Sequence, residues 1–266
     1  MNDEHATRAP QPSVTGQLVA AAAADALAAV AAARDRMLIV ASAANPVAER
    51  VVAASPEQVL RAPGSAAKLV IGAGARSQGL QVVVVLDHGA ADLHEVAEAG
   101  LVVVSTDPAH LTAARDAGLL VVQPAWPQDV APLLDQVLDS GEPAFLRLHP
   151  AQTQRLGAPP DSPSLGVHRI LGDGHAGLLV ASGAGVAPLR EVLPLLAGRG
   201  LDVTAVEAHT LRPGTGLDPA ATAVSILVGR YGLADARELR PVAFEGPPRE
   251  LFARILGALP VPRPVS

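Results

Sequence analysis

Short apolar runs alternate with stretches of helical periodicity through the first part of the chain. Runs such as 81–86 and 101–105 are apolar at nearly every position, whereas the stretches between them repeat their apolar residues at helical spacing. Strands that are apolar throughout are typical of a parallel sheet covered on both faces by helices. The pattern predicts strands at 37–42, 81–86, 101–105, 119–124 and 143–148, and helices at 14–33, 47–54, 66–76, 92–99, 108–117 and 128–138.

The second part of the chain repeats this alternation on a smaller scale. A strand at 178–182, a glycine turn, a helical stretch and a strand at 202–206 predict a right-handed βαβ unit. Further strands are predicted near 223–228 and 240–244, and a closing helix at about 247–258. The predicted fold class is α/β with two parallel-sheet domains. The predicted division is a disordered arm at 1–13, a first domain at 14–150, a turn-rich linker at 151–165 and a second domain at 166–260.

Composition narrows the range of functions. The net charge of −6 and the lack of a basic run argue against nucleic acid as a partner, because neutralising phosphates needs clustered Lys or Arg. The chain has no cysteine, which excludes disulfides, thiolate catalysis and cysteine zinc sites. The apolar stretch 18–33 contains Asp25 and many alanines, so we interpret it as a helix of a soluble protein. We therefore expect no membrane contact and a cytoplasmic location.

Motifs in the second part of the chain carry a resemblance to a known family. Residues 171–183 read Leu-Gly-Asp-Gly-x-x-Gly-Leu-Leu-Val-Ala-Ser-Gly, residues 195–206 read Leu-Leu-Ala-Gly-Arg-Gly-Leu-Asp-Val-Thr-Ala-Val, and residues 210–213 read Thr-Leu-Arg-Pro. In this order they resemble the C-terminal domain of the transketolase family, which includes β subunits of 2-oxo acid dehydrogenases.

The first part of the chain resembles the pyrimidine-binding domain of the same family. The matching features are the Ser-Pro-Glu-Gln turn at 55–58, Gly-Ala-Gly at 72–74, the strand at 119–124 and Gly-Glu-Pro-Ala-Phe-Leu-Arg at 141–147. The family's large diphosphate-binding domain has no counterpart here. The resemblance therefore implies a partner, namely a separate transketolase-like N-terminal subunit, in a homodimer or an α2β2 assembly.

The resemblance also implies a cofactor, thiamine diphosphate with Mg²⁺, bound only together with the partner. In the family, a glutamate activates this cofactor by hydrogen bonding to its pyrimidine ring. That position falls on Ser65 or Ala66, in a stretch without a carboxylate, and Glu57 lies eight positions earlier in the preceding turn. The resemblance places Gly64, Ser65, Ala66 and His88 beside the cofactor. It leaves no catalytic residue, because a serine hydroxyl does not share a proton as a carboxyl does.

Two further departures from the family concern the same region. Residues 81–99 contain no Phe, Tyr or Trp to stack on the pyrimidine ring. The segment 104–108 leaves no room for the family's glycine-rich histidine loop, and His110 lies out of register in the helix that follows. The chain thus resembles a degenerate member of the family.

Other polar motifs have a plain structural explanation as well as a functional one. The sequence Asp-His-Gly at 87–89 follows a buried strand where α/β sheets bind ligands, with Asp92 and His94 nearby, but Asp92 also suits a helix cap. The sequence Gly-Asp-Gly at 172–174 imitates a diphosphate motif, yet a tight turn explains it better. His209 and Arg212 suit a subunit interface, and Trp126 suits packing of the first domain against a neighbour.

Three functions remain open at this point. The chain is a non-catalytic transketolase-like small subunit, a competent β-type subunit of a split thiamine-diphosphate enzyme, or a protein whose site has been rebuilt for another small molecule. The joint loss of the glutamate, the aromatic residue and the histidine loop favours the first of these.

Overall fold

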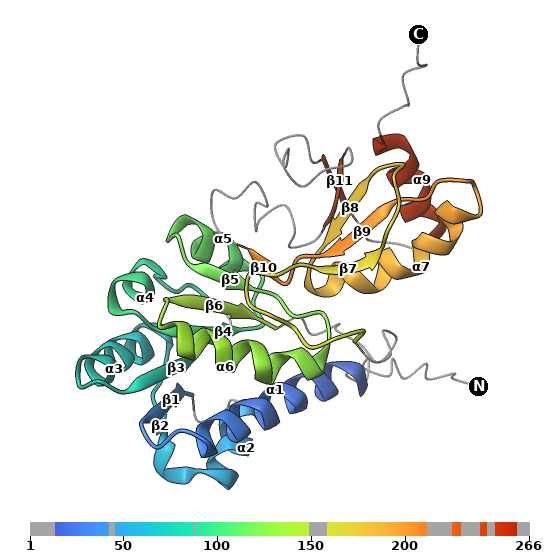
Figure 1. The fold of residues 1–266 in the computed structure, drawn as a ribbon. Coiled ribbons are helices and arrows are strands. Elements are labelled where there is room, and N and C mark those ends of the chain that lie inside the picture. The colour runs from blue at the N-terminus through green and yellow to red at the C-terminus, as the bar shows by residue number, and fades with distance from the viewer. Residues whose placement is uncertain are drawn as a thin grey trace, which may run out of the picture.

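The computed structural model contains two β-sheets flanked by helices (Figure 1). It describes residues 14–42, 46–87, 89–148, 159–211, 225–229, 240–243 and 248–259. The predicted arm at 1–13 and most of the predicted linker therefore lie outside the described residues.

The first sheet has seven strands in the order β10-β5-β6-β4-β3-β1-β2. Every pair is parallel except β10 with β5. Because helices cover both faces, the central strands contain almost only buried apolar residues. The strands are β1 (Met37–Ala41), β2 (Val59–Arg61), β3 (Gln81–Val85), β4 (Val102–Ser105), β5 (Leu120–Val122), β6 (Ala144–Arg147) and β10 (Thr210–Leu211).

Two layers of helices cover the first sheet. Helices α1 (Val14–Ala32), α2 (Pro46–Ala54) and α6 (Val130–Ser140) contribute to the core on one face. On the other face, the core includes residues of α3 (Ser65–Ser77), α4 (His94–Ala99) and α5 (Ala109–Asp116). Gly72 allows α3 to approach the sheet closely, since an added Cβ would lie 3.0 Å from Val84 Cγ2.

The second sheet has five strands in the order β12-β11-β8-β9-β7. Strands β8 (Leu178–Ala181) and β9 (Thr204–Glu207) are parallel and joined through α7 (Val186–Ala197), as predicted. The α/β class is confirmed, but this sheet is mixed rather than parallel, because its other pairs are antiparallel. Its remaining elements are β7 (Arg169–Gly172), β11 (Ser225–Gly229), β12 (Arg240–Ala243) and α9 (Pro248–Ala258).

The two sheets are connected by more than the chain between them. After β9, the chain crosses to the first sheet, where β10 pairs with β5 through Thr210–Val122 and Leu211–Val121. Trp126 follows β5, is 1 % exposed and packs into the core beneath α7 and α9. The neighbour expected for Trp126 is therefore the second part of this chain.

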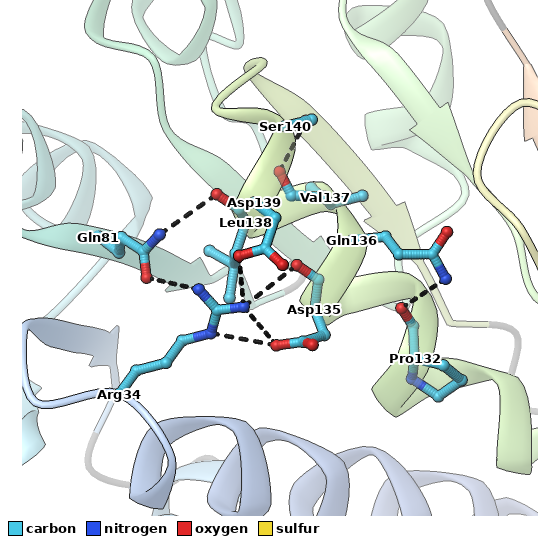
Figure 2. A network of polar contacts seen from close by, with 9 residues as sticks. All are labelled: Arg34, Gln81, Pro132, Asp135, Gln136, Val137, Leu138, Asp139 and Ser140. Atoms are coloured by element: carbon cyan, nitrogen blue, oxygen red, sulfur yellow. Dashed lines mark hydrogen bonds and ion pairs between the residues drawn. The ribbon is translucent and has the colours of Figure 1, made fainter.

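A polar network around Arg34 links the turn after α1 to the amino end of the first sheet (Figure 2). Arg34 Nη1 donates to Gln81 Oε1 (3.0 Å), and Arg34 Nη2 donates to Asp139 Oδ1 (2.8 Å) and to Asp135 Oδ1. Hydrogen bonds to these carboxylates raise the pKa of Arg34. The contacts join the turn after α1 to β3 and α6, on the side of the sheet away from the carboxyl ends of its strands.

The sequence predicted the major helices and strands to within a few residues, but it missed β2, β7 and β10. Part of the predicted linker is held against α6, where Gln136 Nε2 donates to Pro163 O (3.1 Å) and Leu165 N donates to Gln136 Oε1 (2.7 Å). The domain boundaries remain a prediction. Among the described residues, no helix combines the length and the hydropathy needed to cross a bilayer.

Candidate functional site

The carboxyl ends of β1 and β3 form the main candidate site. These neighbouring strands continue into helices on opposite faces of the sheet, α2 after β1 and α4 after β3. Open α/β sheets bind ligands at such a switch point, because the diverging connections leave a crevice. Ser42 follows β1 there, and Asp87 follows β3.

Lys68 joins these two strand ends from α3. Its side chain is fully buried, and Nζ donates to Val85 O (3.1 Å) and to Asp87 Oδ2 (2.5 Å). Ser42 Oγ donates to the other carboxylate oxygen, Asp87 Oδ1, at 2.9 Å. The side chain of Asp87 is 37 % exposed, so this carboxylate reaches solvent while its countercharge does not. A buried ammonium must be paired, so Lys68 and Asp87 act as a unit.

A second network holds the loop after β3 from the side of β4 and α5. Ser105 Oγ lies 2.7 Å from His110 Nδ1, and His110 Nε2 lies 2.5 Å from the carbonyl oxygen of Gly89. Because a carbonyl only accepts, Nε2 carries the proton and the Ser105 hydroxyl donates to Nδ1. Asp107 Oδ2 accepts from Gly89 N at 3.0 Å. His110 therefore positions the loop beside the candidate site.

Gly64, Ser65 and Ala66, which were predicted to lie beside the cofactor, are at the start of α3. Gly64 precedes the helix with φ 67°, a left-handed conformation that favours glycine, Ser65 is its first residue and half-buried, and Ala66 is exposed. His88 lies outside the described residues. The first turn of α3 contains no acidic residue. Glu57 is exposed and precedes β2, so it lies at the opposite end of that strand from Ser65.

A cleft of about 470 Å³ lies next to the start of α3. Of the predicted polar cluster, Asp92 and His94 both line it, and Asp92 Oδ1 accepts from His94 N at 3.0 Å. Asp92 thus binds the backbone N–H of the first residue of α4, although the N-cap position itself is occupied by Leu93. Asp116 pairs with its neighbour Arg115. The lining residues are Ala66, Leu69, Ala90, Ala91, Asp92, Leu93, His94, Glu95, Ala113 and Asp116.

The tight turn predicted at 172–174 is not observed: Gly172 ends β7, and Gly174 lies against the backbone at Asp202. A Cβ added to Gly174 would lie 2.4 Å from the backbone carbon of Asp202, and Thr204 Oγ1 donates to Gly174 O. Contact with the backbone of the neighbouring chain segment accounts for this glycine. In the described part of the chain, no group of three or more His, Cys, Asp or Glu residues is arranged to hold a metal ion.

Arg169 forms a buried ionic cluster between the two sheets, which the sequence did not predict. The residue is 4 % exposed, and its guanidinium lies 4.7 Å from the centre of the Trp126 ring. Arg169 Nη1 donates to Asp129 Oδ2 (2.9 Å) and to Glu207 Oε2 (2.6 Å). Arg169 Nε donates to Asp161 Oδ1 at 2.5 Å. Burial raises the pKa of Glu207 to about 7, although Arg169 opposes this shift.

His209 lies beside this cluster and was expected at a subunit interface. It is 1 % exposed, and Nε2 donates to Ser164 O at 2.9 Å. Burial lowers the pKa of His209 and that of His168. Within the described chain His209 thus lies at an intramolecular junction, whereas Arg212 lies outside the described residues.

The sequence contained a signal for part of what it missed. Lys68 is the one lysine of the chain, on the buried face of a predicted helix, which marks it as a residue that needs a partner. No comparable signal identifies Arg169 among the arginines, because β7 itself was not predicted.

Comparison with known proteins shows the fold. Neither a family model nor a curated protein sequence matches the chain. Among solved structures, an inactive β4 tetramer of a split-gene transketolase matches with a TM-score of 0.66 and 13 % identity, covering 91 % of this chain and 97 % of that one. The transketolase of Campylobacter jejuni matches with a TM-score of 0.60 and 14 % identity, covering 73 % of this chain and 35 % of that one.

A third structure extends the likeness beyond transketolases. The 2-oxoglutarate:ferredoxin oxidoreductase of Magnetococcus marinus matches with a TM-score of 0.52 and 13 % identity, covering 75 % of this chain and 55 % of that one. The chain therefore has a transketolase-like fold. The likeness covers about a third of the Campylobacter chain.

Proposed function

We propose that this chain is the smaller, non-catalytic subunit of a transketolase-like assembly, acting with a separate chain that binds the cofactor diphosphate. One observation carries the proposal: the first turn of α3, where the resemblance requires a glutamate, contains Ser65, Ala66 and Ala67, followed by the buried Lys68. A cation thus lies one turn from the position where activation requires a carboxyl group.

The residues of the site do not fit activation of thiamine diphosphate. The carboxylate nearest to Lys68, that of Asp87, is paired to it and hydrogen-bonded to Ser42. Releasing Asp87 would leave the Lys68 ammonium buried without its countercharge, which is unfavourable. Gly64, Ser65 and Ala66 at the start of α3 offer no group that shares a proton as a carboxyl does. The site is therefore suited to contacting the cofactor and not to activating it.

The partner in this proposal is a transketolase-like N-terminal subunit. The likeness to the split-gene transketolase covers nearly all of both chains, which supports a subunit built on the same plan. We propose a homodimer or an α2β2 assembly in the cytoplasm. The partner would provide the ligands for Mg²⁺ and diphosphate.

The test combines assembly and turnover. The chain and a transketolase-like large subunit of the same organism are mixed with thiamine diphosphate and Mg²⁺, and complex mass, cofactor binding and ketol transfer are measured. We expect a stable complex without turnover, and no cofactor binding by the chain alone. The variant S65E, with S65A as its control, restores partial turnover only if the rest of the site is intact.

The two other hypotheses, a competent subunit and a site rebuilt for another ligand, predict different results. Normal turnover by the wild-type mixture would show a competent subunit and overturn the proposal. Absence of a complex in every mixture would also overturn it. A site rebuilt for another ligand would then be the better explanation, and the cleft beside Ala66 would be the first place to examine.

A further inference from the structure

The ionic cluster between the sheets contains more buried carboxyl groups than buried cations. The side chains of Arg169, Asp129 and Glu207 are 2 %, 1 % and 0 % exposed. A third acid on the same guanidinium, Asp161, has a side chain that is 67 % exposed and is solvated. If both buried acids were ionised, the buried part of the cluster would carry one uncompensated negative charge, which is unfavourable away from water.

The contacts of the two acids identify which one holds the proton. Asp129 accepts from Arg169 through both oxygens, at 2.9 and 3.3 Å. Glu207 accepts from Arg169 through Oε2 alone, and its buried Oε1 has no hydrogen bond of ordinary geometry, although the backbone of Ala125 acts with Arg169 to lower the pKa of Glu207. A proton on Oε1 removes the excess charge and leaves the Arg169 contact intact. The contacts therefore favour Glu207 over Asp129 as the acid that holds a proton.

The neighbouring titratable groups do not supply a second cation. His209 donates Nε2–H to Ser164 O, and burial lowers the pKa values of His209 and His168, so both imidazoles are neutral near neutral pH. The Trp126 ring covers the guanidinium without adding charge. Arg169 is thus shared between the two buried carboxyl groups of the cluster.

We propose that the cluster of Arg169, Asp129 and Glu207 is a proton-dependent fastening between the two sheets, in which Glu207 holds a proton while the junction is closed. Asp129 directly precedes α6, which packs on the first sheet, whereas Arg169 and Glu207 lie on β7 and β9 of the second. Opening the junction exposes Glu207 to water, where it releases the proton. Alkaline conditions therefore favour opening and mildly acidic conditions favour closure, as far as Glu207 is concerned.

His168 and His209 act in the opposite sense. They are neutral when buried and take up protons when exposed, so below their ordinary pKa of about 6.5 they favour opening. The contribution of Glu207 must consequently be measured as a difference between two proteins that share both histidines. E207Q is the suitable variant, because the amide has nearly the shape of the protonated acid.

The first experiment is urea denaturation of the full chain and of E207Q between pH 5 and 8. A raised pKa in the folded state stabilises below the unfolded value and is lost as the pH rises toward about 7. We expect the ratio of unfolding constants, wild type over E207Q, to rise by roughly tenfold or more from pH 5 to 7 and then to level off. D161N is the control, because it removes the exposed acid on the same arginine. The ratio of unfolding constants, wild type over D161N, should not rise in this pH range. A flat ratio for E207Q would overturn the proposal.

A second measurement does not depend on the variant folding. Wild-type protein labelled with ¹³C at glutamate side-chain carboxyls is titrated by NMR. One buried carboxyl is expected to remain protonated well above the other glutamates and to titrate near neutral pH. If every glutamate is ionised by pH 5.5, Glu207 holds no proton and the proposal fails, whether or not E207Q folds.

Discussion

Single side chains at the carboxyl end of the first sheet are held by partners that differ in exposure. Lys68 is fully buried, whereas Asp87 is partly open to solvent. Loss of the partner therefore costs more free energy at Lys68 than at Asp87. If Lys68 is removed, water can solvate the Asp87 carboxylate, whereas the buried Lys68 ammonium has no access to water.

This asymmetry gives a prediction for the Lys68–Asp87 pair. D87N leaves a buried ammonium without a countercharge and should lower the free energy of unfolding by about 3–5 kcal/mol. K68M keeps the volume of the side chain and leaves a solvated carboxylate, so the loss should be smaller, about 1–2 kcal/mol. Urea denaturation at neutral pH measures both. An equal or larger loss for K68M would show that Asp87 depends on Lys68 and not the reverse.

A second residue-scale prediction concerns His209. Its folded pKa is lowered, so the unfolded chain binds a proton first as the pH falls below about 6.5, and stability is lost in that range. Each such group changes the free energy of unfolding by at most about 1.4 kcal/mol per pH unit. H209Q should therefore lose less stability than the wild type between pH 6.5 and 5. Parallel curves for the two proteins would contradict the lowered pKa.

Helix α3 shows how one glycine fixes the distance between an element and the sheet. Gly72 faces Val84, Leu101 and Val82, whereas Gly74 on the same helix has nothing within 4 Å of an added Cβ. The two positions form a matched pair, because both lie within α3 and flank the same residue, Ala73. Helix propensity alone would favour alanine at both.

The pair predicts opposite outcomes for the same substitution. G74A should stabilise the protein by about 0.5–1 kcal/mol through helix propensity. G72A gains the same propensity but forces Val84 Cγ2 back from a 3.0 Å approach, so it should be neutral or destabilising. Thermal denaturation of both variants tests this. Equal stabilisation would show that α3 moves freely away from the sheet.

The helices and strands also show which parts of the fold can be predicted from the sequence and which cannot. Strand β3 was predicted because it is long and apolar, and α6 because its apolar residues have helical spacing. Strands β2 and β10 have three and two residues, too few for a period to show. The direction of β11 is not encoded in its own residues, so the antiparallel pairs of the second sheet could not be foreseen.

At the candidate site, sequence reasoning located α3 and the loop after β3 but not their connection. Lys68 and Asp87 are 19 positions apart, and only the packing of α3 on the sheet brings them together. Arg169 is 38 positions from Glu207 and 40 from Asp129, so its contacts are still harder to predict from sequence. Local motifs predict local turns, and ion pairs of this kind depend on the whole fold.

At the scale of the whole molecule, the Arg34 network and the Arg169 cluster differ in what they contribute. The acids bound by Arg34 have side chains that are 51 % and 65 % exposed, so these pairs are screened by solvent. The Arg169 cluster is buried and joins the two sheets. We expect R34M to cost about 1 kcal/mol and R169M several kcal/mol, measured by urea denaturation at equal salt. A larger loss for R34M would place the main fastening at α1.

The crossing of β10 into the first sheet has a consequence for synthesis of the protein. Translation delivers β5 long before residues 210–211, so a nascent first sheet has an open edge until β7, β8 and β9 of the second sheet have also been made. An unpaired edge invites pairing with other chains. The order of translation therefore makes the ribosome-bound first half the stage at which this protein most needs a chaperone, and a stop codon after the first half would leave that edge open permanently.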